Sequence, residues 1–214
     1  MRWCMKNRWI GVLLTAFLAP IAAAENIDPY NDNNQFAWGE NIGWVNFEPS
    51  LGPGVTAAEY SLTGYAWGEN IGWINLSCRN ADTCGTAEFG VANDGAGNLS
   101  GFAWGENVGW INFNPTVPGD ANRYGVTIDD NGNFSGWAWG ENIGWIRFNS
   151  GGTVPFKVQA CKVSLDDLTH FAQAWLTLGV RPADLDGSGK TDVADFAIFA
   201  NYWKRFCPSG WMLK

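Results

Sequence analysis

The sequence predicts a mainly β protein that ends in a small α-helical domain. Three observations predict this organisation. A phrase of twelve residues recurs four times, apolar stretches are separated by turns rich in Gly and Asn, and after residue 160 the apolar residues change to helical spacing. The expected parts are a signal peptide at residues 1–24, an all-β domain at residues 25–158, a helical domain at residues 159–208 and a tail at residues 209–214.

The first residues have the layout of a secretory signal peptide. Arg2, Lys6 and Arg8 precede the apolar run WIGVLLTAFLAPI, and small alanines at residues 22–24 follow it. The run is short for a membrane span, and no later stretch is apolar enough to cross a bilayer. We therefore expect a secreted protein, extracellular or at the cell surface, with no membrane span.

The repeated phrase carries two tryptophans, two glycines, a glutamate and an asparagine each time. It reads FAWGENIGWVNF at residues 36–47, YAWGENIGWINL at 65–76, FAWGENVGWINF at 102–113 and WAWGENIGWIRF at 137–148. The tryptophans of the shared WGEN segment, Trp38, Trp67, Trp104 and Trp139, are 29, 37 and 35 residues apart. Such a period is typical of repeat proteins, in which one unit cannot bury its apolar face alone.

Each repeat predicts a three-stranded antiparallel meander. In the fourth, the strands are YGVTI, NFSGWAW and WIRF, and the turns between them contain DDNG and GENIG, since Asn and Gly tolerate positive φ. Apolar residues lie on both faces of the strands, so we expect sheets that are covered on both sides. Four such meanders predict either a closed, propeller-like ring or a stacked array.

The segment VPFKVQ, residues 154–159, bears on this choice. It is similar to the opening strands FGVAN and YGVTI, whereas the first repeat has no opening strand of its own. We therefore hypothesise that this segment completes the first repeat and closes a ring. An open array is the alternative.

Two interpretations of the repeated side chains stay open. In the first, the tryptophans form much of the core, while Gly, Glu and Asn shape the turn. In the second, aromatic faces stack on sugar rings and the carboxylates hold sugar hydroxyls. The candidate ligand-binding residues are Trp38, Glu40, Trp44, Trp67, Glu69, Trp73, Trp104, Glu106, Trp110, Trp139, Glu141 and Trp145.

Catalysis is not expected from the repeats. A glycosidase needs two carboxylates in different environments, and four equivalent glutamates in equivalent turns do not supply that difference. The only histidine, His170, lies on an expected helix outside the repeats. We interpret the protein as non-enzymatic.

Four cysteines follow the signal peptide, an even number that predicts disulfides in an oxidising compartment. Cys78 and Cys84 lie close in SCRNADTC, and Cys161 and Cys207 bracket the helical domain. We expect the pairs Cys78–Cys84 and Cys161–Cys207, although the two other pairings stay open. Zinc is disfavoured because neither pair has metal-ligand spacing.

The helical domain contains a loop with oxygen donors spaced as in an EF-hand. Helices are expected after Ser164 and from Val193, and DLDGSGKTDVAD at residues 184–195 lies between them. This pattern predicts one Ca²⁺ site, because Ca²⁺ takes six to eight oxygen ligands. The expected ligands are Asp184, Asp186, Ser188, the backbone carbonyl of Lys190, Asp192 and Asp195.

The segment DLDGSGKTDVADFAIFANYW resembles one calcium-binding unit of a bacterial type I dockerin. Aligning SLDDLTHFAQAW with DVADFAIFANYW places Asp167 opposite Asp195 and Trp175 opposite Trp203. The loop before Asp167, FKVQACKVSLDD, lacks the early acidic ligands, so a single Ca²⁺ site is expected. The resemblance implies a cohesin-type scaffold as partner and a setting in polysaccharide breakdown.

The charge excludes one class of partner. Loss of residues 1–24 removes three basic and no acidic side chains, which takes the net charge from −8 to −11. Such a chain is not expected to bind nucleic acid. The expected function is a secreted, non-catalytic protein with a carbohydrate-binding or adhesive repeat domain, tethered through its dockerin-like module. The alternatives are a cargo glycoside hydrolase and a self-assembling structural surface protein.

Overall fold

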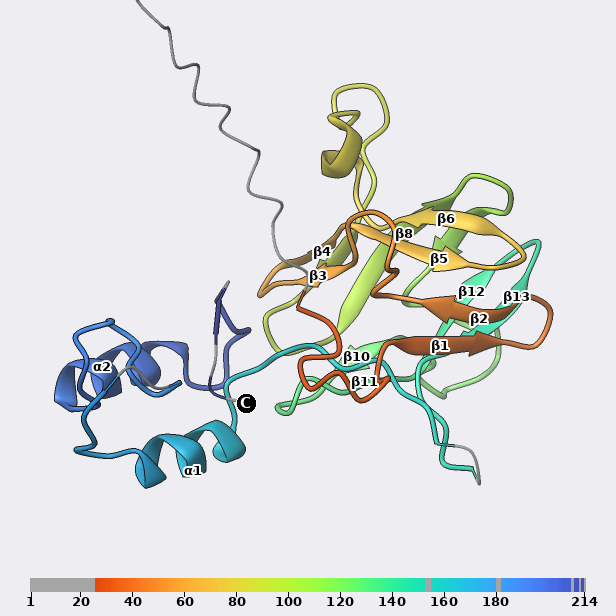
Figure 1. The fold of residues 1–214 in the computed structure, drawn as a ribbon. Helices are drawn as coiled ribbons and strands as arrows, with labels where there is room; N and C mark the ends of the chain where they lie inside the picture. Colours follow the sequence, from red (N-terminus) through yellow and green to blue (C-terminus); the bar gives the residue numbers. More distant parts are fainter. Residues whose placement is uncertain (1–25, 153–154, 180–181, 209, 212, 214) are drawn as a thin grey trace, which may run out of the picture.

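The structure is a computed structural model that describes residues 26–152, 155–179, 182–208, 210–211 and 213 (Figure 1). The expected signal peptide lies outside these described residues. The described chain is mainly β, and it ends in a part with two α-helices beside the β part.

Eight strands of the described chain close into an antiparallel barrel. They form four hairpins, and the last hairpin pairs with the first through β1 and β13. In order around the barrel the strands are β1 (Phe36–Gly39), β2 (Gly43–Asn46), β5 (Tyr65–Gly68), β6 (Gly72–Asn75), β8 (Leu99–Gly105), β9 (Gly109–Asn112), β12 (Trp137–Gly140) and β13 (Gly144–Arg147). The closed arrangement is therefore the one observed, as a barrel and not as a propeller-like ring, and the alternative of an open array is wrong.

Short strands continue the barrel wall at its other end. They are β3 (Thr56–Ala57), β4 (Ser61–Thr63) and β7 (Val91–Asn93), which continue from β8, and the separate pair β10 (Thr127–Ile128) and β11 (Phe134–Ser135). The segment after the fourth hairpin joins the edge of the first: Val158 bridges to Gln35, and the N–H of Phe36 donates to the carbonyl of Lys157 at 3.3 Å. The prediction that the segment VPFKVQ pairs with the first repeat is therefore confirmed for its described residues.

The barrel interior is filled by small residues opposite larger ones. Each hairpin places an alanine of its first strand against a β-branched residue of its second, as in Ala103 opposite Ile111. The equivalent pairs are Ala37–Val45, Ala66–Ile74 and Ala138–Ile146, and all of these residues are buried. The last residue of each phrase belongs to the same buried core: Phe47, Leu76, Phe113 and Phe148.

The repeated tryptophans lie outside this core. None of the eight is buried, because successive side chains of a strand point to opposite faces and the alanines occupy the inner face. The first of the two interpretations, in which the tryptophans form much of the core, is therefore wrong. Only the inner face of each hairpin is fully buried.

The four hairpin turns are joined in a cycle of hydrogen bonds. In each turn the asparagine side chain donates to a backbone carbonyl of the neighbouring turn. The bonds run from Asn41 to Ile143 (3.2 Å), Asn142 to Val108 (3.1 Å), Asn107 to Ile71 (3.1 Å) and Asn70 to Ile42 (3.0 Å). The residue after each asparagine is buried, so these four apolar side chains close one end of the barrel.

Both turn glycines are required by this geometry. A Cβ on Gly39 would lie 2.6 Å from Cγ1 of Ile42, and Gly43 has a φ of +76°. A side chain at the first position would displace the residue that closes the barrel, and the second position favours glycine because its φ is positive.

The C-terminal part has a second, small core. Helix α1 (Leu165–Gln173) and helix α2 (Val193–Tyr202) each begin with a capping box. Phe171, Phe199, Trp211 and Leu213 pack together in this core. Trp211 and Leu213 belong to the segment expected to be a tail, so packing extends the module beyond residue 208.

Both predicted disulfides are present, Cys78–Cys84 and Cys161–Cys207. The second joins the segment that leaves the barrel to the end of the helical module. Disulfides are the expected state of cysteines in an oxidising compartment. Neither helix of the described chain is long and apolar enough to cross a membrane.

Replacing Asn107 by Ala removes one bond of the turn cycle and leaves a carbonyl of the next turn without its donor. We expect the free energy of unfolding to fall by about 1 kcal/mol, measured by urea denaturation. Glu106→Gln is the matched control, because its side chain is exposed at the same turn, and it should change stability by less than about 0.5 kcal/mol. Equal losses in the two variants would contradict a structural role specific to the asparagine.

Candidate functional site

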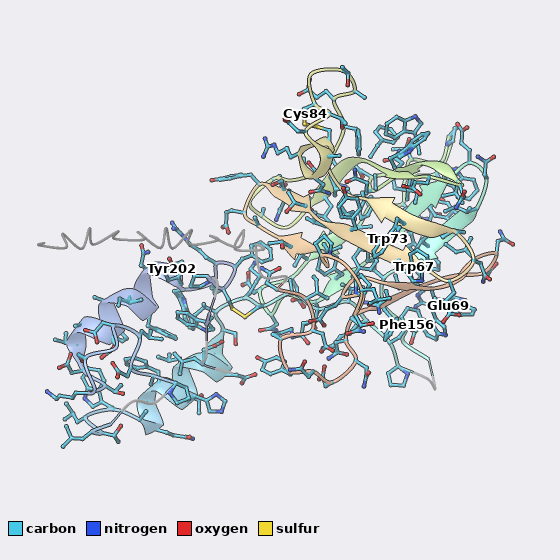
Figure 2. The ribbon with its side chains drawn as sticks, turned by 45° about the horizontal axis from the view of Figure 1, so that its top comes forward. Trp67, Glu69, Trp73, Cys84, Phe156 and Tyr202 are labelled. Atoms are coloured by element: carbon cyan, nitrogen blue, oxygen red, sulfur yellow. A yellow bond between two sulfur atoms is a disulfide. The ribbon has the colours of Figure 1, made fainter. Side chains whose placement is uncertain are left out.

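The outer wall of the barrel carries four pairs of tryptophans. Each pair faces across one hairpin with an edge-to-face contact, and the ring centroids are 4.7–4.9 Å apart. Figure 2 shows Trp67 and Trp73 on the second hairpin, with Glu69 near its tip. The exposed fractions are largest on the first and third hairpins: 36% for Trp38, 40% for Trp44, 37% for Trp104 and 47% for Trp110. Half of the pairs are thus open to solvent.

Further aromatic side chains extend the wall. The residue at the start of each phrase contacts the second tryptophan edge-on, as in Phe102 and Trp110, whose centroids are 6.3 Å apart. Another aromatic comes from the segment before the short opening strand. These contacts are Phe89–Trp110 (5.4 Å), Tyr124–Trp145 (5.2 Å) and Phe156–Trp44 (5.2 Å).

Sequence reasoning missed Phe89, Tyr124 and Phe156. A signal was present, because each of them stands two residues before a buried valine, at Val91, Val126 and Val158. The similarity of the opening strands therefore extends to a residue on the outer wall.

One groove on this wall joins the third and fourth hairpins. It has a volume of 940 Å³, and the exposed pair Trp104 and Trp110 lies in it. Its other aromatic lining residues are Phe89, Phe102 and Trp139, and its polar side chains are Glu88, Asn112, Glu141 and Asn142. Apolar faces with a few polar groups around them are the usual surroundings of a bound small molecule or polymer segment.

The repeated glutamates are exposed at the hairpin tips. The turn beside each one is closed by a backbone bond, such as the N–H of Val108 to the carbonyl of Gly105 at 3.2 Å. The bond to the neighbouring turn comes from asparagine. The fold thus explains Gly and Asn in the phrase, whereas Glu40, Glu69, Glu106 and Glu141 are available at the surface.

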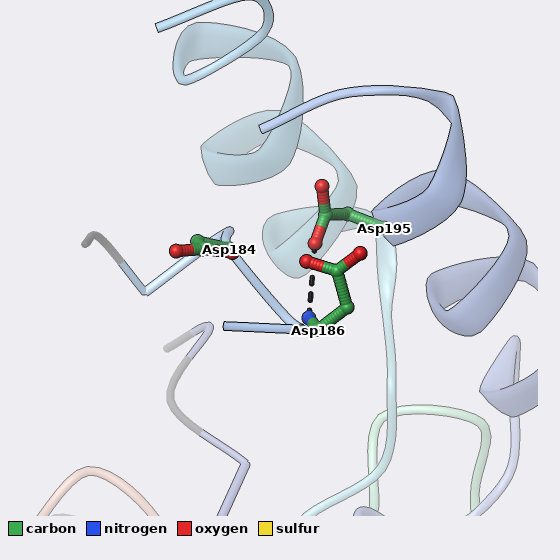
Figure 3. A group of neighbouring side chains, drawn as sticks. All are labelled: Asp184, Asp186 and Asp195. Atoms are coloured by element: carbon green, nitrogen blue, oxygen red, sulfur yellow. Dashed lines mark hydrogen bonds between the residues drawn. The ribbon is translucent and has the colours of Figure 1, made fainter. Parts of the chain in front are cut away.

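The helical module contains a cluster of three carboxylates. Oxygens of Asp184, Asp186 and Asp195 lie within 4.8 Å of one another (Figure 3). Asp195 is fully buried, and its carboxylate accepts the N–H groups of Leu185 (2.6 Å), Asp186 (3.1 Å) and Asp192 (2.8 Å). Asp184 is 5% exposed, and its Oδ1 is buried with no hydrogen-bond partner in the described part of the chain.

The other expected calcium ligands lie beside this cluster. Ser188 Oγ donates to the carbonyl of Lys190 at 3.3 Å, so these two oxygens are neighbours. Asp192 instead caps α2 by accepting the N–H of Ala194 at 2.9 Å, and it pairs with the ammonium of Lys190 at 3.2 Å. The N–H of Ala194, and then Lys190, lower the pKa of the Asp192 carboxyl. The structure therefore brings together three of the six expected ligands and gives Asp192 a capping role.

Asp167 occupies the position in α1 that matches Asp195 in α2. It is 2% exposed, and it accepts the N–H of Ser164 at 2.9 Å and the indole N–H of Trp211 at 2.8 Å. Where the second loop supplies backbone N–H groups to Asp195, the first helix thus uses an indole from the C-terminal segment. Sequence reasoning missed Trp211, since nothing local connects it to Asp167.

Comparison of the chain with models of protein families, with curated proteins and with solved structures finds no match.

Replacing Trp211 by Phe keeps an aromatic ring in the second core but removes the indole donor from a buried carboxylate. We expect a loss of about 1–3 kcal/mol in the free energy of unfolding of the helical module, measured by urea denaturation. Trp175→Phe is the control, because Trp175 is 42% exposed. A change in the Trp211 variant no larger than in the control would contradict a stabilising bond to Asp167.

Proposed function

We propose that this protein is a secreted, non-catalytic polysaccharide-binding protein that is displayed through a dockerin-like, calcium-binding module. One observation carries the proposal: the repeated tryptophans lie on the outer wall of a barrel whose interior is already filled. The core does not need them. Exposed aromatic surface of this extent on a folded domain is typical of an interaction site.

A polysaccharide suits the chemistry of this wall. A sugar ring has an apolar face of C–H groups and an edge of hydroxyl groups. The indole faces can pack against the first, and carboxylate and amide groups can bond the second. Trp104 and Trp110 supply the aromatic surface in the groove, while Glu141 and Asn112 supply the polar groups. We interpret the four hairpin units as four copies of one repeat, each with its own aromatic pair.

The helical module fits a calcium ion. Three clustered carboxylates concentrate negative charge, and a buried oxygen of Asp184 has no donor in the described chain. Such an arrangement favours a cation with a preference for hard oxygen ligands. Asp184, Asp186 and Asp195 would hold the ion, with Ser188 and the carbonyl of Lys190 beside them.

The dockerin-like part would attach the barrel to a cohesin-type scaffold. The loop that leads into α2, the matching helix α1 and the disulfide Cys161–Cys207 support this interpretation. With one metal loop, the module relies on the disulfide and on Trp211 where a dockerin would use its other calcium loop.

The test of glycan binding is an array of neutral and acidic polysaccharides probed with the chain from residue 25 onward. We expect binding to at least one polysaccharide, with an affinity reduced at least tenfold by Trp104→Ala combined with Trp110→Ala. Trp175→Ala, an exposed tryptophan of the helical module, should bind as well as the unchanged protein. A folded protein that binds nothing on the array would overturn the proposal.

The calcium proposal predicts heat on titration with CaCl₂ and a higher melting temperature in its presence, because an ion bound by the folded state stabilises it. Asp184→Asn should abolish both effects. Asp192→Ala should lower stability by about 1 kcal/mol through loss of the helix cap, yet keep the response to calcium. An unchanged calcium response in the Asp184 variant would place the ion elsewhere.

A further inference from the structure

The four tryptophan pairs share one phrase but differ in what surrounds them. The residue before the added aromatic is Glu88 beside the third hairpin, Arg123 beside the fourth and Pro155 beside the first. On the fourth hairpin the guanidinium of Arg147 also lies over the ring of Trp137, 5.1 Å from its centroid. The wall therefore offers surfaces of different charge.

One side of the groove at the third hairpin is formed by residues outside the repeated phrase, Glu88 and Phe89. Residues 78–89 form a loop between β6 and β7 that projects from the barrel, and the disulfide Cys78–Cys84 lies within it (Figures 1 and 2). The loop begins with the short 3₁₀ helix η1 (Cys78–Ala81).

The end of this loop is held against the groove. The N–H of Cys78 donates to the carbonyl of Phe89 at 3.0 Å, and Thr83 closes the turn by donating its N–H to the carbonyl of Cys78 at 3.0 Å. The disulfide-bonded Cys78 is thus hydrogen-bonded to Phe89, the residue that contacts Trp110. Glu88, the residue before Phe89, lies at the groove.

The charged side chains that line the groove are all acidic. Glu88 and Glu141 both line it, one from the loop and one from the tip of the fourth hairpin. Of the described residues that line it, none is Lys or Arg. Carboxylates can accept hydrogen bonds from sugar hydroxyls, but they repel the carboxylate or sulfate groups of an acidic polymer.

We infer that this groove is the selective glycan site of the barrel and that it takes a segment of a neutral polysaccharide. This inference rests on the proposed function, and it adds the position of the binding site on the barrel and the chemical class of the polysaccharide. Trp104 and Trp110 pack against sugar rings, Phe89 fixes the position of Trp110, and Glu88 and Glu141 accept hydroxyl bonds and exclude acidic chains.

Affinity electrophoresis tests the ligand class. The probes are hydroxyethyl cellulose, galactomannan, xylan and a soluble β-glucan, each compared with its carboxymethylated form, with chitosan as the cationic polymer. We expect retardation by a neutral probe and at least tenfold weaker retardation by its carboxymethylated form. Glu88→Gln combined with Glu141→Gln should keep the affinity for the neutral probe within about threefold and gain binding to the carboxymethylated one.

Tryptophan variants test the place. Trp110→Ala should reduce affinity for the neutral probe at least tenfold, whereas Trp44→Ala, the equivalent exposed residue of the first hairpin, should reduce it less than threefold. Loss in the Trp44 variant alone would move the site and overturn this inference while leaving the proposed function intact. Preference for a carboxymethylated probe, or salt-sensitive binding to chitosan alone, would also overturn it. Absence of binding to every probe would overturn both.

The stapled loop has its own test. Cys78→Ser combined with Cys84→Ser should weaken binding to the neutral probe at least threefold, because Phe89 and Glu88 lose their fixed position. Cys161→Ser combined with Cys207→Ser is the control, since that disulfide lies in the helical module, and it should leave binding unchanged. Equal affinity of the Cys78/Cys84 variant and the unchanged protein would exclude the loop from the site.

Discussion

The narrow interior of an eight-stranded barrel is the constraint on which the rest of this structure depends. Such a barrel has room for side chains to fill it and little more. Here the space is taken by alanine opposite valine or isoleucine in every hairpin, with one phenylalanine or leucine from each. An indole does not fit beside them. The tryptophans, which alternate with the alanines, therefore have to lie outside.

The repeated phrase consequently serves two purposes with different residues. Glycine gives the turn its shape, asparagine bonds the neighbouring turn, and the residue after asparagine closes the end of the barrel. Because every hairpin needs these residues in the same places, the four copies of the phrase are nearly identical at them. Tryptophan and glutamate lie on the outer surface, where packing of the core does not determine which residue is present. We propose that the barrel binds a polysaccharide through them.

Much of the fold could be predicted because it is local. The hairpin turns, the capping box at Ser164 and the disulfide Cys78–Cys84 follow from neighbouring residues. Cys161–Cys207 could be expected because the two cysteines bracket the helical domain, whereas Asp192, expected as a calcium ligand, also caps α2. Alternation shows which residues share a face of a strand, but it does not show which face is inside, and this is why the sequence left open whether the tryptophans form the core. The asparagine cycle, the groove of Trp104 and Trp110 and the bond from Trp211 to Asp167 join residues distant in sequence. Only the closed chain brings them together.

The central claim is that the tryptophan pairs lie outside the core and that the exposed pair Trp104 and Trp110 forms the binding surface. The most direct measurement is the broadening of the indole N–H signals in a ¹⁵N–¹H spectrum by a soluble paramagnetic agent, with and without a bound polysaccharide. We expect Trp38, Trp44, Trp104 and Trp110 to broaden in the free protein, and Trp104 and Trp110 to be protected by the polysaccharide. Protection of all eight repeat indoles in the free protein would contradict the claim, because it would return the tryptophans to the core.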